Sequence, residues 1–310
     1  MNLRKVHAKF ATDEECLQYI QQMRWPDGVV RCPVCGNDKV KRSERKSKSK
    51  NKRAWFFVCL ERTCLQQFSP TSGTIFHDSH LPLIVWFHAI TLILNAKKGI
   101  SAKQLQRDLG IGGYKTAWYL NHRIREVMQD ASAPKLGGIV EIDETYIGGR
   151  QKGRGVKYGK AQKQTVIGLR QRGGPLRLVH TPDAKVATTK AVITSHVSDD
   201  VEFVMTDQSG IYPPALKDSK ATHLVVNHIR GEYVRGIAHT NTIENAFSLL
   251  KRGIIGNFHK VSIRHLQRYL DEFSYRFNRR AQGADVFIET VRRLCGFKPL
   301  PFASLTAEKA

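Results

Sequence analysis

Four residues between positions 143 and 251 have the types and spacing needed for metal-dependent cutting of a phosphodiester. Asp143 stands within Glu-Ile-Asp-Glu-Thr-Tyr-Ile-Gly-Gly, Asp207 follows an apolar stretch, and Glu244 begins a segment that reaches Lys251. Two Mg²⁺ or Mn²⁺ ions roughly 3.5–4 Å apart stabilise charge on the attacking and leaving oxygens when carboxylates hold them. We therefore expect the three acids to hold two such ions and Lys251 to reach nucleic acid bound over them.

The elements that position these acids follow from the spacing of apolar residues. Strands are predicted at residues 139–147, 165–170, 176–180 and 201–206, with a helix at 188–196. Asp143 then lies within the first strand and Asp207 at the end of the last. Thr240 is predicted to cap a further helix, with Glu244 beside its apolar stripe and Lys251 two turns on. This order predicts a mixed α/β sheet with helices on its faces.

Other carboxylates compete for the same roles, because a chain of this size contains many triples of acids. Glu141 lies two residues before Asp143 on the same predicted strand face and remains a candidate ligand. Glu144 is predicted to point to the opposite face, because side chains alternate along a strand. Three further acids in predicted loops are interpreted as solvated charges: Asp199, Asp200 and Asp218.

The charge of the chain predicts a polyanionic partner. Its 310 residues contain 50 Lys+Arg against 27 Asp+Glu, a formal net charge of +23. Nucleic acid is the leading candidate and an anionic membrane the weaker one. The stretch 150–177 holds nine basic residues and no acid directly after the first predicted strand. Within it we expect four residues to contact DNA phosphates: Arg150, Lys152, Arg154 and Lys157.

Four of the six cysteines form two pairs, Cys32 with Cys35 and Cys59 with Cys64. Thiolates on two tight turns are typical of a tetrahedral structural Zn²⁺ site, so we predict a zinc ribbon. The second pair is spaced more widely than usual, and reduced core cysteines are the alternative. Cys16 and Cys295 have no partner in sequence and are expected to be buried. The basic run 39–53 between the pairs is predicted to be a hairpin tip that contacts DNA phosphates.

Residues 101–130 predict two helices joined by a short glycine-containing turn. Ser101 begins the first with a capping box, and Gly110, Gly112 and Gly113 separate it from the second. Such a pair predicts a helix-turn-helix whose second helix enters a DNA major groove, although any helical hairpin shares the pattern. Its expected DNA contacts are Lys115, Asn121 and Arg123. Composition changes after it, which places a domain boundary near residue 135.

Two further segments bear on location and on the end of the chain. Residues 1–10 lack the apolar core of an export signal, so we expect a cytoplasmic, nucleoid-associated protein with no membrane role. The apolar stretch 81–94 is interrupted by His88 and predicts a buried helix entered through Pro82. Residues 266–295 predict helical core, with three arginines as further candidates to face DNA: Arg276, Arg279 and Arg280.

Six motifs in order resemble the DDE transposases of bacterial insertion sequences, most closely the ISXO-like group. They are Cys-Pro-Val-Cys-Gly at 32–36, Phe-Ser-Pro-Thr-Ser-Gly-Thr-Ile-Phe at 68–76, Lys-Thr-Ala-Trp-Tyr-Leu-Asn-His-Arg-Ile-Arg at 115–125, Glu-Ile-Asp-Glu-Thr-Tyr-Ile-Gly-Gly at 141–149, His-Thr-Asn-Thr-Ile-Glu at 239–244 and Arg-Phe-Asn-Arg-Arg at 276–280. The last four, in this order, are specific to the family. The resemblance covers nearly the whole chain.

This resemblance implies an RNase H-like catalytic domain with a mixed five-stranded sheet at residues 135–300. It also implies a zinc ribbon within 1–76 and a helical DNA-binding part at 77–134. Asp143, Asp207 and Glu244 match the three catalytic acids, and Lys251 matches the basic residue that follows them. Because some relatives carry Asn at the third position, Asn241 stays an alternative to Glu244. His228 and His239 flank this region, either near the metals or as structural histidines.

The expected function is therefore transposition by two-metal catalysis. The protein would bind the terminal inverted repeats of its own element, cut DNA and join the freed 3′-OH ends to target DNA, as a homodimer or larger assembly. One alternative is a zinc-ribbon and helix-turn-helix DNA-binding regulator whose RNase H-like domain is inactive. Another is a nuclease acting on RNA, although no RNA-binding signature occurs.

Overall fold

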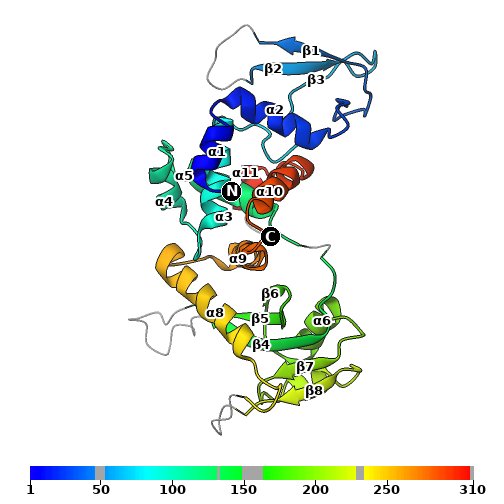
Figure 1. Cartoon of the computed structure of the whole chain (residues 1–310), viewed down its shortest axis with the longest axis vertical. Helices are drawn as coiled ribbons and strands as arrows, with labels where there is room; N and C mark the ends of the chain where they lie inside the picture. The colour runs from blue at the N-terminus through cyan, green and yellow to red at the C-terminus, as the bar shows by residue number, and fades with distance from the viewer. Residues whose placement is uncertain (46–52, 131–132, 149–162, 228–233, 308–310) are drawn as a thin grey trace. The chain divides into compact units, whose positions relative to one another are not determined.

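The chain forms two compact units in a computed structural model that describes all residues except 46–52, 131–132, 149–162, 228–233 and 308–310 (Figure 1). Unit 1 comprises Met1–Met128 together with Gln282–Ala310, and unit 2 comprises Gln129–Ala281. The division after Met128 lies close to the boundary predicted near residue 135. The C-terminal limit differs from the predicted 300, because the last segment of the chain folds with unit 1.

Unit 1 is mainly helical, with one small sheet. Its elements are α1 (Leu3–Lys9), α2 (Asp13–Arg24), β1 (Val40–Glu44), β2 (Trp55–Cys59), β3 (Gln67–Phe68), α3 (Leu83–Asn95), α4 (Ala102–Asp108), α5 (Tyr114–Glu126), α10 (Asp285–Gly296) and α11 (Phe302–Thr306). The helix α3 begins after Pro82, as predicted, and buries most of its apolar side chains. Among the residues that the structure describes, no helix is both long and apolar enough to cross a bilayer.

The four paired cysteines come together beside the three-stranded sheet β1-β2-β3. Their sulfurs all lie within 4.8 Å of one another, with Cys32 3.7 Å from Cys64 and Cys35 3.6 Å from Cys59. Four thiolates about 2.3 Å from one Zn²⁺ would stand roughly 3.8 Å apart, so the donor set fits a tetrahedral zinc ion. Burial opposes ionisation of Cys32, but the amides of Cys35 and Val34 lower the pKa of its thiol to about 7.

The ribbon has a small aromatic core that packs against α2. Phe57 of β2 lies 5.6 Å from Phe68 of β3 and 6.1 Å from Trp25, measured between ring centroids. Trp55 donates its indole N–H to Gln21 of α2 at 3.0 Å. The aromatic strand β2, which ends at Cys59, therefore joins the cysteine cluster to the helices. Residues 46–52 of the basic run lie outside the described residues.

The helix α10 returns to unit 1 because its apolar stripe is completed there. Phe287 is 1% exposed, and its ring centroid lies 5.6 Å from that of Phe87 and 6.1 Å from that of Phe10. Phe10 in turn meets Phe87 edge-on at 4.8 Å. Aromatic pairs in these arrangements stabilise a core beyond the area that they bury. The N-terminal segment, α3 and α10 are thus joined by one aromatic cluster.

Unit 2 is an α/β unit built on one mixed sheet. Its elements are β4 (Ile139–Ile147), β5 (Gln164–Gln171), β6 (Leu176–Thr181), α6 (Val186–His196), β7 (Phe203–Thr206), α7 (Tyr212–Ala215), β8 (Thr222–Val225), α8 (Asn241–Gly253), a π-helical turn (Ile254–Phe258), a 3-10 turn (Ile263–His265) and α9 (Leu266–Arg279). The five strands lie in the order β6-β5-β4-β7-β8, with β4, β7 and β8 parallel and the other pairs antiparallel. The mixed five-stranded sheet is thus confirmed.

Helices cover both faces of this sheet, and α8 crosses over β4 and β5 (Figure 1). One apolar layer joins the sheet to α6 and α7 through Val140, Ile142, Ile167, Leu169, Val192 and Tyr212. The other joins it to α8 and α9 through Val166, Leu178, Ile243, Phe247, Leu270 and Phe273. The strand β4 lies in the middle of the sheet and contributes Val140 and Ile142 to one layer and Ile147 to the other, so packing holds it from both faces.

Removal of zinc should unfold the ribbon, because binding of the ion and folding of this small sheet are linked. We expect Cys64→Ser to lose bound zinc and a strong chelator to increase hydrogen exchange mainly over residues 25–70. Cys16→Ala is the matched control, since Cys16 is buried in α2 away from the cluster. Unchanged zinc content in Cys64→Ser, measured by atomic absorption, would contradict the ribbon site.

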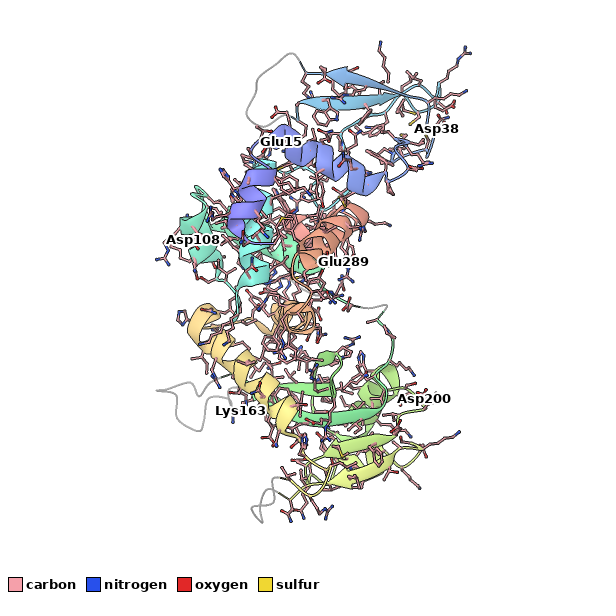
Figure 2. All side chains as sticks on the ribbon, in the orientation of Figure 1. Glu15, Asp38, Asp108, Lys163, Asp200 and Glu289 are labelled. Atoms are coloured by element: carbon pink, nitrogen blue, oxygen red, sulfur yellow. The ribbon has the colours of Figure 1, made fainter. Side chains whose placement is uncertain are left out.

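Truncation of Phe287 should destabilise unit 1. A Phe→Ala change in a well-packed core costs about 3–5 kcal/mol, from lost burial and the cavity left behind. Denaturant unfolding of the full chain measures this loss in the free energy of unfolding. Glu289→Ala on the same helix is the control, because the side chain of Glu289 is 40% exposed (Figure 2) and pairs with the exposed Arg292. Equal losses in the two variants would show that α10 does not anchor this core.

Candidate active site

Three carboxylates of unit 2 meet at one edge of the sheet. Asp143, Glu144 and Asp207 each offer an oxygen, and these oxygens lie within 4.8 Å of one another. The pairing of β4 with β7 covers only Ile139–Glu141, and β7 ends at Thr206. Asp207 therefore emerges beside the part of β4 that carries the other two acids. The predicted meeting of Asp143 with Asp207 is present in the structure.

Glu144 also belongs to this group, which the sequence-based prediction did not include. Its strand face is the opposite one, as predicted, because its carboxylate accepts a hydrogen bond from the hydroxyl of Tyr212 in α7. However, no strand covers β4 on this side beyond Glu141, so side chains from both faces can reach the open edge. Burial and the neighbouring charge of Asp207 raise the pKa of Glu144 despite that hydrogen bond.

The carboxylates repel one another in a partly buried place. Burial, followed by the charges of Asp207 and Glu144, raises the pKa of Asp143 to about 8. The amide of Glu144 donates to Asp143 at 2.8 Å, and the amide of Ser209 donates to Asp207 at 3.1 Å. Oxygens on opposite sides of one Mg²⁺ stand roughly 4.2 Å apart, so this donor set fits such an ion after small side-chain rotations. A divalent cation would replace the repulsion by attraction.

Glu244 stands beside this group but is not part of it. It is exposed on the first turns of α8, and the hydroxyl of Thr240 donates to its carboxylate at 2.7 Å. Its charge is one of those that raise the pKa of Asp143, so the two carboxylates share one electrostatic environment. Asn241, the alternative third residue, is also exposed, at the first position of α8. The 4.8 Å group of acids does not include Glu244.

Lys251 is exposed two turns along α8, as the helical spacing predicts. Together with Tyr146, Ile255 and His259 it lines a cavity of about 240 Å³ between the end of β4 and the π-helical turn. Tyr146 and Ile255 are large hydrophobic residues that remain 47% and 71% exposed. Lys251 is thus an exposed basic group with apolar neighbours, on the helix that also carries Glu244.

The helix that carries Glu244 begins differently from the prediction. Thr240 makes no side-chain capping bond to the helix, since its hydroxyl donates to Glu244. Instead, Glu141 of β4 accepts from the amides of Thr242 and Ile243 at 2.9 and 3.0 Å. Both oxygens of the buried Glu141 are bonded within the protein and it is not part of the 4.8 Å group, so the structure does not place it as a metal ligand. His239 lies beside the same carboxylate, with Nδ1 3.1 Å from Oε1, and so has a structural contact.

Gly168 allows α8 to lie close to the sheet. This glycine of β5 is paired with Asp143, and a Cβ atom built on it would stand 2.6 Å from Phe247 and 2.7 Å from Ile243. A glycine inside a strand often marks a close approach of another element. The signal is present in the sequence as a lone glycine within an apolar run, although it does not reveal which element approaches.

The predicted DNA contacts have different outcomes. Lys115 is exposed at the start of α5, whereas Asn121 and Arg123 are buried, so the prediction is wrong for those two. The Arg123 guanidinium donates to the carbonyls of Ile75 and His77 and lies 4.9 Å from the ring of Trp86. Asn121 and Arg123 both lie on the face of α5 that packs against the rest of unit 1. The spacing of apolar residues did not distinguish this face from the exposed one. The other four predicted contacts lie outside the described residues: Arg150, Lys152, Arg154 and Lys157.

The acids interpreted as solvated charges are exposed, as predicted. Asp200 lies in the turn that precedes β7 (Figure 2), next to the exposed Asp199. Asp218 pairs with Lys190 at the surface. Two of the C-terminal arginines, by contrast, are engaged within unit 2, Arg276 with Glu272 and Arg279 with Asp130, each at 3.1 Å.

Comparison with known proteins gives a consistent family. Residues 135–278 match the model of the ISXO2-like transposase domain, and residues 11–56 match that of a transposase zinc-ribbon domain. An uncharacterized protein in transposable element ISH50 of Halobacterium salinarum is 30% identical over 283 residues, which cover 86% of this chain and 91% of that protein. The transposase match spans the carboxylate group and α8, and the zinc-ribbon match spans the first cysteine pair. The chain belongs to the ISXO2-like transposases.

Proposed function

We propose that the chain is a divalent-metal-dependent DDE transposase. It binds the terminal inverted repeats of its own insertion element, cuts DNA there and joins the freed 3′-OH ends to target DNA. The observation that carries this proposal is the convergence of Asp143, Glu144 and Asp207 at one sheet edge, with Glu244 on the adjacent helix. The mixed five-stranded sheet is the scaffold that an RNase H-like catalytic domain requires.

Two phosphoryl-transfer steps make up this activity. In the first, water attacks the phosphorus at the element end, the bond from phosphorus to the 3′-oxygen breaks, and a 3′-OH is released. In the second, that hydroxyl attacks a phosphodiester of the target and displaces another 3′-oxygen. Water and the 3′-OH are the nucleophiles, so no covalent protein intermediate is needed.

The residues of the site have separate parts in these steps. Asp143, Asp207 and Glu244 would hold two Mg²⁺ or Mn²⁺ ions, with Glu144 as a further carboxylate. The ions would stabilise charge on the attacking and leaving oxygens. Tyr212 fixes the rotamer of Glu144 through its hydroxyl hydrogen bond. Lys251 contacts the DNA backbone beside the acids.

Charge and helix geometry support DNA as the partner. The net charge of +23 favours a polyanion, and exposed Lys115 lies in the first turn of α5, the second helix of the α4–α5 pair. We interpret this pair and the zinc ribbon as the parts that recognise the element ends. Two ends must be held together for joining, so a homodimer or larger complex on nucleoid DNA is expected.

A regulator with an inactive catalytic half is the second candidate. The ribbon and the α4–α5 pair would serve it equally well. The carboxylate group favours the enzyme, because three acids within 4.8 Å cost stability unless a cation uses them. Strand transfer with purified protein decides between the two, and cleavage of RNA in place of DNA would favour a nuclease.

Replacement of Asp143 should abolish cutting. We expect Asp143→Asn to reduce Mg²⁺-dependent cleavage of end-bearing DNA by at least about a hundredfold, because it removes a carboxylate from the developing charge. DNA affinity should stay within about twofold, since phosphate contacts lie elsewhere. Asp200→Asn, an exposed acid of the same unit, should cleave like the unaltered protein. Undiminished cutting by Asp143→Asn would remove this residue from the site.

Replacement of Lys251 should weaken positioning of DNA. Lys251→Ala is expected to lower end binding and to reduce the slope of log affinity against log salt by about one ion. Lys217→Ala is the matched control, since Lys217 is an exposed lysine that follows α7 in the same unit. Filter binding across a salt series measures both. If the two variants behave alike, Lys251 is only a solvated charge.

A further inference from the structure

The buried carboxylate of Glu141 holds the first turn of α8 from a neighbouring strand. Its Oε2 accepts three hydrogen bonds, from the amide and hydroxyl of Thr242 at 2.9 and 2.7 Å and from the amide of Ile243 at 3.0 Å. Glu141 itself is 0% exposed. We propose that Glu141 is a positioning residue of the active site, which fixes Glu244 relative to Asp143 by capping α8. This inference rests on the proposed function.

The helix needs a cap from elsewhere because its own sequence supplies none. The first four amides of a helix have no partner within it. Thr240 does not accept from them, and the side chain of Ile243 is buried, so solvent does not replace the missing acceptor. An ionised carboxylate also interacts favourably with the positive end of a helix dipole. Glu141 therefore satisfies both the hydrogen bonds and the charge of this terminus.

Arg172 extends the contact to the segment that enters the helix. Its Nε donates to Glu141 Oε1 at 2.7 Å, while its two terminal nitrogens donate to the carbonyls of Ile237 at 2.7 Å and His239 at 2.9 Å. A buried carboxylate without such a partner would be strongly destabilising. One guanidinium thus joins Glu141 to the chain on the N-terminal side of α8, and the helix is held before and after its start.

The path from Glu141 to the two acids is short on both sides. Asp143 lies two residues along the same strand as Glu141. Glu244 directly follows Ile243, whose amide donates a hydrogen bond to Glu141. Gly168 removes the side chain that would otherwise keep α8 away from this strand pair. A shift of the first turn of α8 would therefore move Glu244 relative to Asp143. Loss of the Glu141 cap alone would thus be enough to change the distance between Glu244 and Asp143.

Glu141→Gln tests the cap. A neutral amide has one oxygen and one NH₂ group, so it must present donors either to Arg172 or to the amides of Thr242 and Ile243. We expect faster hydrogen exchange at residues 241–245 and a cleavage rate lower by about 10- to 100-fold, as for other residues that orient metal ligands. Glu202→Gln, at an exposed acid of the same unit, should change neither. Unchanged exchange at 241–245 in Glu141→Gln would overturn the proposal.

A double variant separates positioning from general destabilisation. If Glu141 acts through Glu244, the loss in Glu141→Gln/Glu244→Gln should barely exceed the loss in Glu244→Gln alone. If the fold-losses in cleavage rate of Glu141→Gln and Glu244→Gln multiply in the double variant, the positioning role is overturned. Should Glu141→Gln fail to fold, Arg172→Lys keeps the positive charge but loses the forked contact, and the same comparison with Glu244→Gln applies. A full-length protein that cuts no DNA would refute the proposed function, whereas hydrogen exchange would still decide the cap.

Discussion

Repulsion among the clustered carboxylates is the constraint on which the rest of unit 2 depends. Asp143, Glu144 and Asp207 stand within 4.8 Å of one another, and burial with these neighbours raises the pKa of Asp143 to about 8. Such a cluster persists only where the surrounding structure determines it strongly. The central strand β4, packed on both faces, provides that rigidity, and the early end of β7 provides the open edge where the acids meet.

The same strand also controls the helix that carries the remaining acid. Glu141 caps α8, and Gly168 on the neighbouring strand lets the helix lie close. Alternation along β4 places Glu141 and Asp143 on one face and Glu144 on the other, where the hydroxyl of Tyr212 donates a hydrogen bond to Glu144. The three acids of this strand thus have three different physical tasks. Glu141 caps a helix, Asp143 is a central ligand candidate, and Glu144 is a second ligand candidate on the opposite face of the strand. Burial and hydrogen-bond partners distinguish them, whereas residue type does not.

Sequence predicted the elements well because their signals are local. Apolar alternation placed β4 at its observed bounds and the other predicted strands within two residues, and cysteine spacing predicted the cluster. The fifth strand, Thr222–Val225, was not assigned because it is short and only partly buried. Contacts between distant segments could not be predicted: the cap of α8 by Glu141, the place of Glu144 at the open edge, and the return of α10 to unit 1.

Burial also decides which charges of a basic chain can meet DNA. A net charge of +23 suggests that most arginines face a polyanion, yet Arg123 is 3% exposed and bonded to backbone carbonyls. Arg172 stabilises a buried carboxylate, and Arg276 pairs with the buried Glu272. A planar guanidinium can satisfy several carbonyls or a carboxylate at once, which suits it to such structural positions. Lysines such as Lys115 and Lys251, by contrast, remain exposed, because a hydrated ammonium is costly to bury. Among the residues that the structure describes, the charge open to a polyanion is therefore carried by fewer side chains than composition implies.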